Sequence, residues 1–378
     1  MLTVEKSTDI HATLNKIFDE SNTGKHQYCY ISNAQGKEWL FAADSVNSVR
    51  LGLNIYEPQS QKGKLIKYFL PYFQPLLNKK ALFGIKKVHA NIDENLEERL
   101  KRLFNCSHIH CSFFLGTPSV HQKIVMQVDD GAKILGYAKV SDNNEVKESF
   151  EKEYQFLIWI REKGINNVPK PLLCEIEGTG IFIQTSQKDS RSYSDPGINK
   201  TLVQFLREMR DKTITRTAFE DTDYYRLFQN YSDILNYYPG NKNRLEQQIE
   251  SVIDGYRGKE VMFSAYHGDF TPWNTFYNSD KSLHVFDFEY AAKTYPPMLD
   301  LYHWFVSDCI FRLHMNADEI YKSFKTSSIQ KYDKNAVANM KQYLISQIVF
   351  YLYREDNHPT GDVLRNMNIW GQLIDYFH

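Results

Sequence analysis

Short apolar runs alternate with segments of helical spacing along the first hundred residues. A polar turn at 33–36 separates two of the runs, which predicts a β-hairpin. The apolar runs that predict strands in this part are 28–31, 39–42 and 49–56. The segments with the apolar spacing of helices are 64–77 and 96–104. We expect residues 1–105 to form a small α/β unit of their own, in which we recognise no chemical motif.

The pattern changes after about residue 109, and beyond residue 200 the chain becomes mostly helical. The sequence Asp129-Asp130-Gly131 predicts a tight turn between two strands. The runs that predict strands are 111–116, 123–128, 134–140 and 181–184. One helix is predicted at 147–162. The chain should therefore be an α+β protein, with a small antiparallel sheet at 106–187 and a mostly helical unit at 188–378.

The composition fits a folded globular protein and excludes several classes of partner. Hydrophobic residues make up 42% of the chain and charged residues 24%, and the formal net charge is −1. We therefore expect no nucleic-acid partner and no anionic membrane surface as partner. The chain start has no signal-peptide pattern, and the apolar stretch 343–353 is too short to span a bilayer. Five cysteines without a regular framework fit a reducing compartment, so the expected location is cytoplasmic.

Three polar residues in the segment 266–290 have the chemistry that phosphoryl transfer needs. Its transition state requires positioned oxygens, neutralised charge and an oriented hydroxyl. Asp269 could accept the proton of the attacking hydroxyl, and Asn274 and Asp287 could offer oxygens to a hard cation. A hairpin predicted between residues 275 and 286 would bring Asn274 and Asp287 together.

This segment resembles the catalytic loop of the aminoglycoside phosphotransferase and choline kinase superfamily, distant relatives of protein kinases. The loop reads His267-Gly268-Asp269, with Asn274 five residues beyond the aspartate, and Asp287-Phe288-Glu289 follows the hairpin. Residues 285–291 are especially similar to the choline and ethanolamine kinase branch. The resemblance covers about residues 109–304.

The resemblance implies a bilobal protein-kinase-like fold, with a small antiparallel-sheet N-lobe, a helical C-lobe and the extra N-terminal segment. It implies ATP and Mg²⁺ as cofactors and Asp269 as the catalytic base. Asn274 and Asp287 would be the magnesium ligands. Glu289 could contact a second metal ion or the substrate, or it could bond the loop. His267 is expected to be structural, and Asp300 occupies a position that the family uses structurally.

Two residues upstream match the lysine and the glutamate that a kinase uses to hold the α and β phosphates. Lys139 lies late on a predicted strand, and Glu153 lies on the following helix. Lys133 would lie on the same side of the strand as Lys139 and is the alternative to it. Glu151 is the alternative to Glu153. The order of the motifs favours Lys139 and Glu153.

The phosphate loop and the adenine hinge are assigned more indirectly. Residues 116–121 contain one glycine where protein kinases have three, and Ser119 with nearby backbone amides could meet phosphate. Residues 184–187 would face adenine by analogy of fold, which makes Gln184 and Ser186 candidates for nucleotide binding.

Three further groups of residues admit a functional reading, although each has a plainer structural one. The group Cys106, His108, His110 and Cys111 invites a zinc site, but neighbouring ligands on a strand rarely close a tetrahedron. Aromatic residues after Asp287 could cage a quaternary ammonium group or could simply be core. These are Tyr290, Tyr295, Tyr302, Trp304 and Phe305. The acidic residues Glu220, Asp221 and Asp223 could bind a cationic acceptor or form a solvated loop.

The leading interpretation is an ATP-dependent kinase whose acceptor is a hydroxyl of a sugar, an aminosugar, an aminoglycoside or an amino alcohol such as choline. The alternative is a catalytically silent kinase-like protein that binds nucleotide or a partner, which the presence of Asp269, Asn274 and Asp287 disfavours. A protein kinase is a third reading, but no Ala-Pro-Glu segment follows Asp287. Residues 1–105 could serve a larger substrate, a partner or a homo-oligomer.

Overall fold

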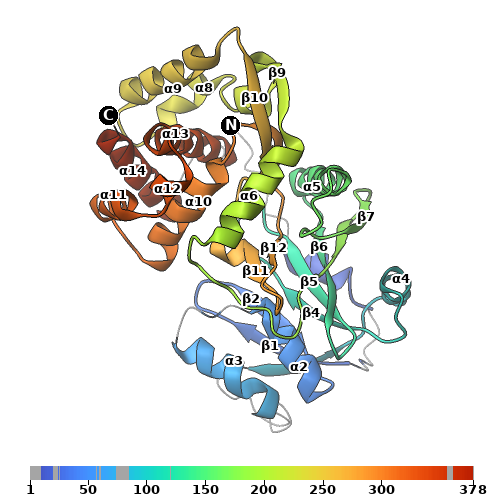
Figure 1. Cartoon of the computed structure of the whole chain (residues 1–378). Coiled ribbons are helices and arrows are strands. Elements are labelled where there is room, and N and C mark those ends of the chain that lie inside the picture. Colours follow the sequence, from blue (N-terminus) through green and yellow to red (C-terminus); the bar gives the residue numbers. More distant parts are fainter. Residues whose placement is uncertain are drawn as a thin grey trace, which may run out of the picture. The chain divides into compact units, whose positions relative to one another are not determined.

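The computed structural model describes residues 10–19, 24, 26–56, 58, 61–73, 85–119, 121–355 and 361–377. The chain divides into two compact units, each continuous except for one exchanged segment. Unit 1 comprises Met1–Ile158 and Val168–Arg191, and unit 2 comprises Trp159–Asn167 and Ser192–His378. Unit 1 consists of an antiparallel sheet with helices, and unit 2 is mostly helical (Figure 1).

Unit 1 is built on one eight-stranded antiparallel sheet with the order β3-β1-β2-β4-β5-β6-β8-β7. The strands are β1 (His26–Ser32), β2 (Glu38–Ala42), β3 (Lys86–Ala90), β4 (His110–Phe114), β5 (Ile124–Asp129), β6 (Ile134–Ser141), β7 (Pro171–Glu175) and β8 (Gly180–Thr185). The helices are α1 (Ile10–Asn15), α2 (Val46–Gly52) with the 3₁₀ turn Leu53–Ile55, α3 (Gln61–Phe73), α4 (Glu94–Phe104) and α5 (Asn144–Glu162), whose last turn belongs to unit 2.

The first strands bury side chains on both faces of the sheet. Along β1, Tyr28 packs into the core that also contains Leu100 of α4, whereas Cys29 and Ile31 pack into a second core with Val49 of α2. The alternation follows from the period of two in a strand. A sheet covered on both faces needs helices on both sides, and the N-terminal segment supplies them.

The expected boundary near residue 105 does not separate the two compact units. β2 pairs with β4, with Trp39 opposite Phe114 and Leu40 opposite Phe113. The strands of residues 1–105 therefore extend the same sheet that β5 and β6 belong to. Backbone pairing across this point joins the expected N-terminal unit and the expected N-lobe into one body.

The predicted strand at 49–56 is wrong, because this segment forms α2 and a 3₁₀ turn. Ser45 caps the helix: its side chain accepts from the backbone of Ser48, and the Ser48 side chain accepts from the Ser45 backbone. This reciprocal arrangement satisfies two backbone donors at the helix start. Val49 and Leu53 are buried one turn apart, which is helical rather than strand spacing.

The other predicted elements of unit 1 are confirmed within a few residues. The hairpin is β1 and β2, and α4 and α5 cover the predicted helices at 96–104 and 147–162. The helix predicted at 64–77 is α3, although residues 74–77 lie outside the described part of the chain. The strands β3 and β7 were not predicted.

Unit 2 packs its helices around two small sheets. Its strands are β9 (Thr215–Ala218), β10 (Glu260–Tyr266), β11 (Thr275–Tyr277), β12 (Leu283–Val285) and β13 (Ala292–Tyr295). Its α-helices are α6 (Lys200–Thr213), α7 (Asp223–Leu227), α8 (Tyr231–Ile234), α9 (Lys242–Tyr256), α10 (Leu299–Ser307), α11 (Ala317–Thr326), α12 (Ile329–Tyr332), α13 (Ala336–Arg354) and α14 (Gly361–Tyr376). Its shorter helical turns are Phe219–Asp221, Leu235–Tyr237 and Pro272–Asn274, and a π-helical turn Asp308–Arg312 follows α10.

Helix α10 lies at the centre of unit 2, because every one of its residues is buried. It packs against α13, which in turn packs against α14 (Figure 1). A helix that is buried on all sides can carry polar side chains only where they find partners. Asp300 and His303 of α10 are such side chains. No helix in the described residues is both long and apolar enough to cross a membrane.

Candidate active site

The loop after β10 has a shape that only glycine permits at its second position. Gly268 has a φ of +85°, and a Cβ placed there would lie 2.3 Å from the backbone oxygen of Tyr290. A side chain at this point would collide with backbone, which cannot move aside easily. The sequence His267-Gly268-Asp269 is therefore a turn that sends the chain past Tyr290 and presents Asp269.

Asp300 of α10 holds the backbone of this loop. Its Oδ2 accepts from the amide of His267 at 2.9 Å, and its Oδ1 accepts from the amide of Gly268 at 3.2 Å. Burial raises the pKa of Asp300 to about 7, against the opposing effect of these amides and of nearby His303. Asp300 thus supports the loop, in the structural position that the resemblance implies.

His267 is a neutral linker within the loop. Its Nδ1 accepts from the Asp269 amide at 3.2 Å, which leaves its Nε2 to donate to the Phe286 oxygen at 3.1 Å. Burial lowers the pKa of His267 to about 4, so the ring is neutral at physiological pH. Both ring nitrogens contact backbone, and the ring joins the loop to the residue just before Asp287.

The low pKa of His267 predicts a pH-dependent contribution to stability. The unfolded chain takes up this proton below pH ~6.5, but the folded chain does so only near pH 4. The contribution is therefore complete above pH ~6.5 and is lost as the pH falls toward 4. We expect the difference in unfolding free energy between wild type and His267→Asn to shrink by about 1.4 kcal/mol per pH unit in this window. Urea unfolding of both proteins from pH 4 to 7 measures it, and a difference independent of pH would contradict the assignment.

Two donors fix the carboxylate of Asp269. Its Oδ1 lies 3.1 Å from Nε2 of His303, and its Oδ2 accepts from Nδ2 of Asn274 at 2.7 Å. Burial alone would raise the pKa of Asp269, but the hydrogen bond with His303 holds the pKa below its ordinary value. The side chain keeps 29% of its surface exposed, so the carboxylate is ionised and accessible.

The hairpin β11–β12 brings Asn274 and Asp287 close together, as predicted. The strands pair from Thr275 opposite Val285, and the Phe286 amide donates to the Asn274 oxygen at 3.0 Å. Asn274 is buried, and because its Nδ2 faces Asp269, its Oδ1 is turned away from that carboxylate. Asp287 has a φ of +68°, a conformation that aspartate tolerates better than most residues.

The donors of Asn274 and Asp287 suit a hard divalent cation. Both offer oxygen, and magnesium completes its octahedron with phosphate and water, so a few protein ligands suffice. The described residues contain no cluster of three or more His, Cys, Asp and Glu side chains that could hold a metal. This also gives no support to a zinc site at Cys106, His108, His110 and Cys111.

Glu289 lies close to a cation that the sequence did not reveal. Burial lowers the pKa of Arg354, on the last turn of α13, but the nearby Tyr290, Tyr351 and Glu289 raise it above its ordinary value. The guanidinium of Arg354 lies 5.0 Å from the ring centre of Tyr290 and 5.3 Å from that of Tyr351. Arg354 therefore covers the aromatic face at which the sequence suggested a cation cage.

Three of the other members of the suggested cage, Tyr302, Trp304 and Phe305, are core residues, and Tyr295 is half-buried. Tyr302 and Trp304 are fully buried in α10, and Tyr295 stacks on Tyr266 with ring centres 4.6 Å apart. The acidic group is structural as well: Asp223 accepts from the backbone of Lys293, and Glu220 accepts from the amide of Gly258.

In unit 1 the predicted ion pair between Lys139 and Glu153 is present. Nζ of Lys139 lies 2.6 Å from Oε2 of Glu153, and both side chains are buried. The rivals Lys133 and Glu151 are exposed. A buried lysine needs a close counter-charge, and Glu153 supplies it.

The remaining candidates lie along the strands of unit 1. Gly116 has a φ of +75° and turns the chain after β4, and Ser119 is exposed farther along this loop. Val120 is outside the described residues. Gln184 is buried in β8, and the Ser186 amide donates to the Leu135 oxygen at 2.8 Å.

A family comparison adds an independent observation to this geometry. The model of the phosphotransferase enzyme family (APH) matches residues 121–315, which is more than half of the chain. The chain belongs to this phosphotransferase family. The resemblance seen in the sequence is thereby confirmed, and the α+β class expected with it, an antiparallel sheet followed by a mostly helical unit, is the one observed. No curated protein matches the chain.

Solved structures similar to this chain include a choline kinase, an aminoglycoside phosphotransferase and a putative fructosamine-3-kinase. The choline kinase LicA from Streptococcus pneumoniae is 16% identical, with a TM-score of 0.49, and the match covers 75% of this chain and 99% of LicA. The gentamicin complex of APH(2")-IIa is 12% identical (TM-score 0.43, coverage 75% and 96%). A putative fructosamine-3-kinase from Haemophilus somnus 129PT is also 12% identical (TM-score 0.44, coverage 74% and 96%). At these identities the likeness does not extend to substrate.

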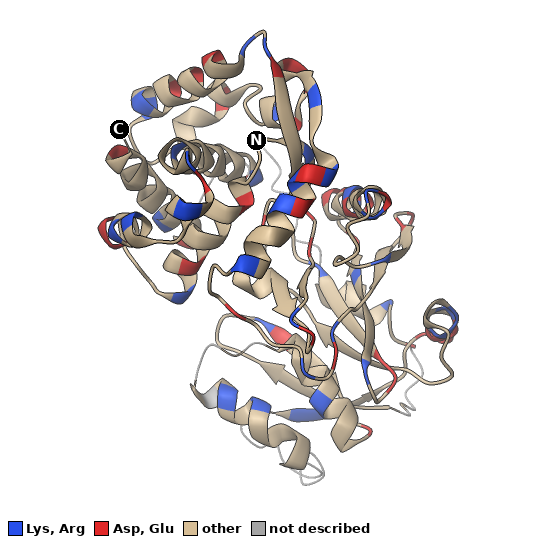
Figure 2. Ribbon diagram, viewed as in Figure 1, with Lys and Arg blue, Asp and Glu red and all other residues tan. Residues whose placement is uncertain are grey.

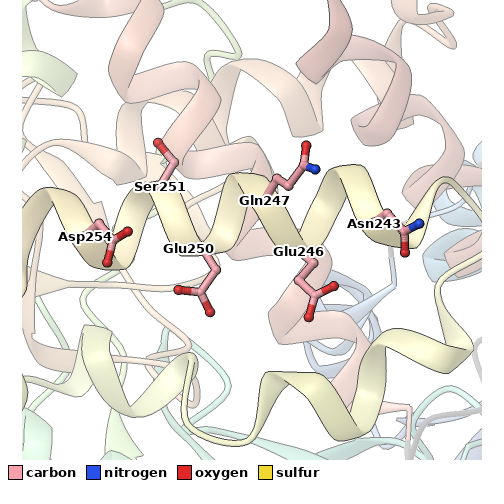
Figure 3. Close-up of a pocket in the computed structure, with 6 residues that line it drawn as sticks. All are labelled: Asn243, Glu246, Gln247, Glu250, Ser251 and Asp254. Carbon is pink, nitrogen blue, oxygen red and sulfur yellow. The ribbon is translucent and has the colours of Figure 1, made fainter.

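A surface depression of unit 2 is lined by side chains of a single helix. It runs along α9, and Figure 3 shows the side chains that line it. These are Asn243, Glu246, Gln247, Glu250, Ser251 and Asp254. Glu250 already bonds Tyr231, and Asp254 pairs with Arg257. The depression contains none of the residues that the family motif identifies.

Two residues that contact the motif of this phosphotransferase were missed in the sequence. His303 contacts Asp269, and Arg354 covers Tyr290. His303 had a signal: it lies three residues after Asp300, so both project from the same face of one helix. Arg354 had none, because nothing in the sequence relates the end of α13 to the catalytic loop.

Proposed function

We propose that this chain is an ATP- and Mg²⁺-dependent phosphotransferase that phosphorylates a hydroxyl of a small molecule. The observation that carries the proposal is the Asp269 carboxylate, ionised, accessible and held between His303 and Asn274. An oriented carboxylate beside an oxygen-donor pair is the arrangement that in-line phosphoryl transfer uses. Family membership supports the same class of reaction.

In the proposed reaction, Asp269 accepts the proton of the acceptor hydroxyl. The hydroxyl oxygen bonds to the γ-phosphorus of ATP as the bond between that phosphorus and the β–γ bridging oxygen breaks. Asn274 and Asp287 would hold magnesium, with Glu289 nearby for a second ion or the acceptor. Bound magnesium neutralises the charge that develops on the phosphate oxygens. The Asn274 amide serves twice, since its nitrogen orients Asp269 while its oxygen is directed elsewhere.

The nucleotide would be bound by residues of unit 1. We assign Lys139 to the α and β phosphates, with Glu153 orienting its ammonium group. Ser119 is proposed at the phosphate loop, and Gln184 and Ser186 at the adenine hinge. The buried Lys139–Glu153 pair is the structural support for these assignments.

Lys139→Met is expected to raise the dissociation constant for ATP about 10- to 100-fold, because a hydrogen-bonded charge contributes about 1.5–3 kcal/mol. Lys133→Met, in the exposed turn just before β6, should leave this dissociation constant unchanged. Isothermal titration with magnesium and ATP measures both. Thermal unfolding of each variant is run first, since Glu153 loses its buried partner in Lys139→Met. A folded Lys139→Met that binds ATP like wild type would contradict the assignment.

The acceptor is proposed within sugars, aminosugars, aminoglycosides and amino alcohols. Of the aromatic residues considered for a choline cage, Tyr302, Trp304 and Phe305 are core residues, and Arg354 covers Tyr290. These contacts give no preference for a quaternary ammonium over a sugar. The deciding test is ATP consumption with magnesium against a panel that includes glucosamine, kanamycin, choline and ethanolamine, with Asp269→Asn as control. The acceptor is the compound that the wild type phosphorylates and the Asp269→Asn variant does not.

The alternative is a catalytically silent kinase-like protein that binds nucleotide or a partner. It predicts magnesium-dependent ATP binding without turnover on any acceptor. GTP is compared with ATP in the same assay, because the donor is part of the proposal. If neither ATP nor GTP binds, both the kinase and the silent nucleotide-binding protein are contradicted.

We also propose a cytoplasmic location without nucleic-acid or membrane partners, and self-association through the N-terminal segment. One face of α3 carries large apolar side chains that are 42–69% exposed, a pattern typical of an interaction surface. These are Leu65, Tyr68, Phe69, Tyr72 and Phe73. The helix contains lysines and no acidic residue (Figure 2). Sedimentation velocity on the full chain tests self-association, and a monomer at every concentration would contradict it.

A further inference from the structure

His303 occupies a buried position directly behind the carboxylate of Asp269. Only 4% of the surface of His303 is exposed, and its Nε2 lies 3.1 Å from Oδ1 of Asp269. An ionised carboxylate only accepts hydrogen bonds, so Nε2 carries the proton in this contact. His303 and Asp300 lie three residues apart on α10, and thus one rigid helix holds both the backbone of the loop and the side chain of Asp269.

A second buried residue fixes the ring of His303 from behind. The hydroxyl of Tyr343, on α13, lies 3.2 Å from Nδ1 of His303, and the two rings meet edge to face at 84°. Ser307, one turn beyond His303 on α10, is a further partner of the Tyr343 hydroxyl. With Nε2 protonated toward Asp269, Nδ1 is the acceptor for Tyr343. A series of side-chain contacts, Tyr343–His303–Asp269, therefore connects α13 through α10 to the loop.

The geometry explains why Asp269 needs this support. The last torsion of an aspartate side chain is broad, so one hydrogen bond leaves the carboxylate free to rotate. Asn274 holds Oδ2 and His303 holds Oδ1, and two donors on opposite oxygens fix the carboxylate plane. A base must point a lone pair at the acceptor hydroxyl, and displacement by about 1 Å can lower the rate about 100-fold.

We propose that His303, backed by Tyr343, is a positioning residue that orients the Asp269 carboxylate for proton abstraction. This inference rests on the proposed function of Asp269 as base. It goes beyond the motif, because the loop and hairpin residues alone supply only one of the two donors. A purely structural histidine at this place would stabilise the fold without changing the rate of the chemical step.

The test compares His303→Leu, which removes the donor, with His303→Gln, whose amide nitrogen reaches about the same place as Nε2. In His303→Leu we expect kcat to fall roughly 10- to 100-fold with the KM for ATP unchanged. His303→Gln should recover most of the loss, and Tyr343→Phe should fall between the two. In the Asp269→Asn background, His303→Leu should have no further effect, because both changes act on one group.

A second measurement does not depend on turnover. Nitrogen-15 NMR of the His303 ring should show protonated Nε2 and unprotonated Nδ1, and Asp269→Asn should shift the Nε2 signal. Wild-type kcat in folded His303→Leu, or a ring protonated at Nδ1 alone, would overturn the positioning role and leave the proposed function intact. A wild type that phosphorylates no acceptor would overturn the proposed function, and this role with it.

Discussion

Asp269→Asn is expected to lower kcat for phosphoryl transfer about 10²- to 10⁴-fold, the usual contribution of a general base. The amide keeps the shape of the side chain but cannot take the proton of the hydroxyl. The affinity for magnesium and ATP should be unchanged, because Asp269 is not assigned to either. Steady-state kinetics on the acceptor found in the panel gives kcat, and calorimetry gives the nucleotide affinity.

The variant also alters the contacts of Asp269, and this needs a control. The new amide cannot accept from both His303 and Asn274, so one of those hydrogen bonds is lost. Asn274→Asp would disturb the same contact by placing two carboxylates together. Asp269→Asn is therefore compared with wild type in thermal unfolding first. Transfer at the wild-type rate in the folded variant would remove Asp269 from the role of base.

Asp287→Asn is expected to raise the dissociation constant of the magnesium–ATP complex about 10- to 100-fold, because it loses one charged ligand worth about 1.5–3 kcal/mol. Asparagine is preferred to alanine here, since residue 287 has a φ of +68° and asparagine tolerates that conformation. Asp287→Ala should show the larger defect, because it loses the oxygen as well as the charge. Titration with ATP at several magnesium concentrations measures the effect.

A matched control for this prediction lies in the depression on α9. Glu246 is an exposed acidic residue of unit 2 outside the motif, and Glu246→Ala also removes one negative charge. It should leave the magnesium–ATP affinity unchanged. Equal weakening by Glu246→Ala and Asp287→Asn would indicate a general charge effect, and no weakening by Asp287→Asn would exclude Asp287 as a magnesium ligand.

The sequence predicted the features whose causes are local. The hairpin that joins Asn274 to Asp287 follows from apolar runs around a turn, and the glycine at 268 follows from the loop motif. The pair Lys139–Glu153 was also predicted from two elements that follow each other in the sequence, a strand and then a helix. In these cases the residues that decide the structure are close along the chain.

The sequence failed where contacts between distant segments decide the structure. The apolar run 49–56 reads as a strand by composition, but the cap at Ser45 and burial of Val49 make it a helix. The cage aromatics were ambiguous, because only the position of α10 at the centre of unit 2 shows that Tyr302 and Trp304 are core. The contact of His303 with Asp269 spans 34 residues and depends on how α10 packs.

The pairing of β2 with β4 gives the first hundred residues a part in protecting the rest of the sheet. Without β1, β2 and β3, the outer side of β4 would be an open edge, with unpaired amides and carbonyls next to apolar side chains such as Phe113. Open edges of this kind recruit other strands and lead to aggregation. The N-terminal segment thus acts as an edge cover, and a chain that lacks residues 1–105 is expected to aggregate through the exposed edge of β4.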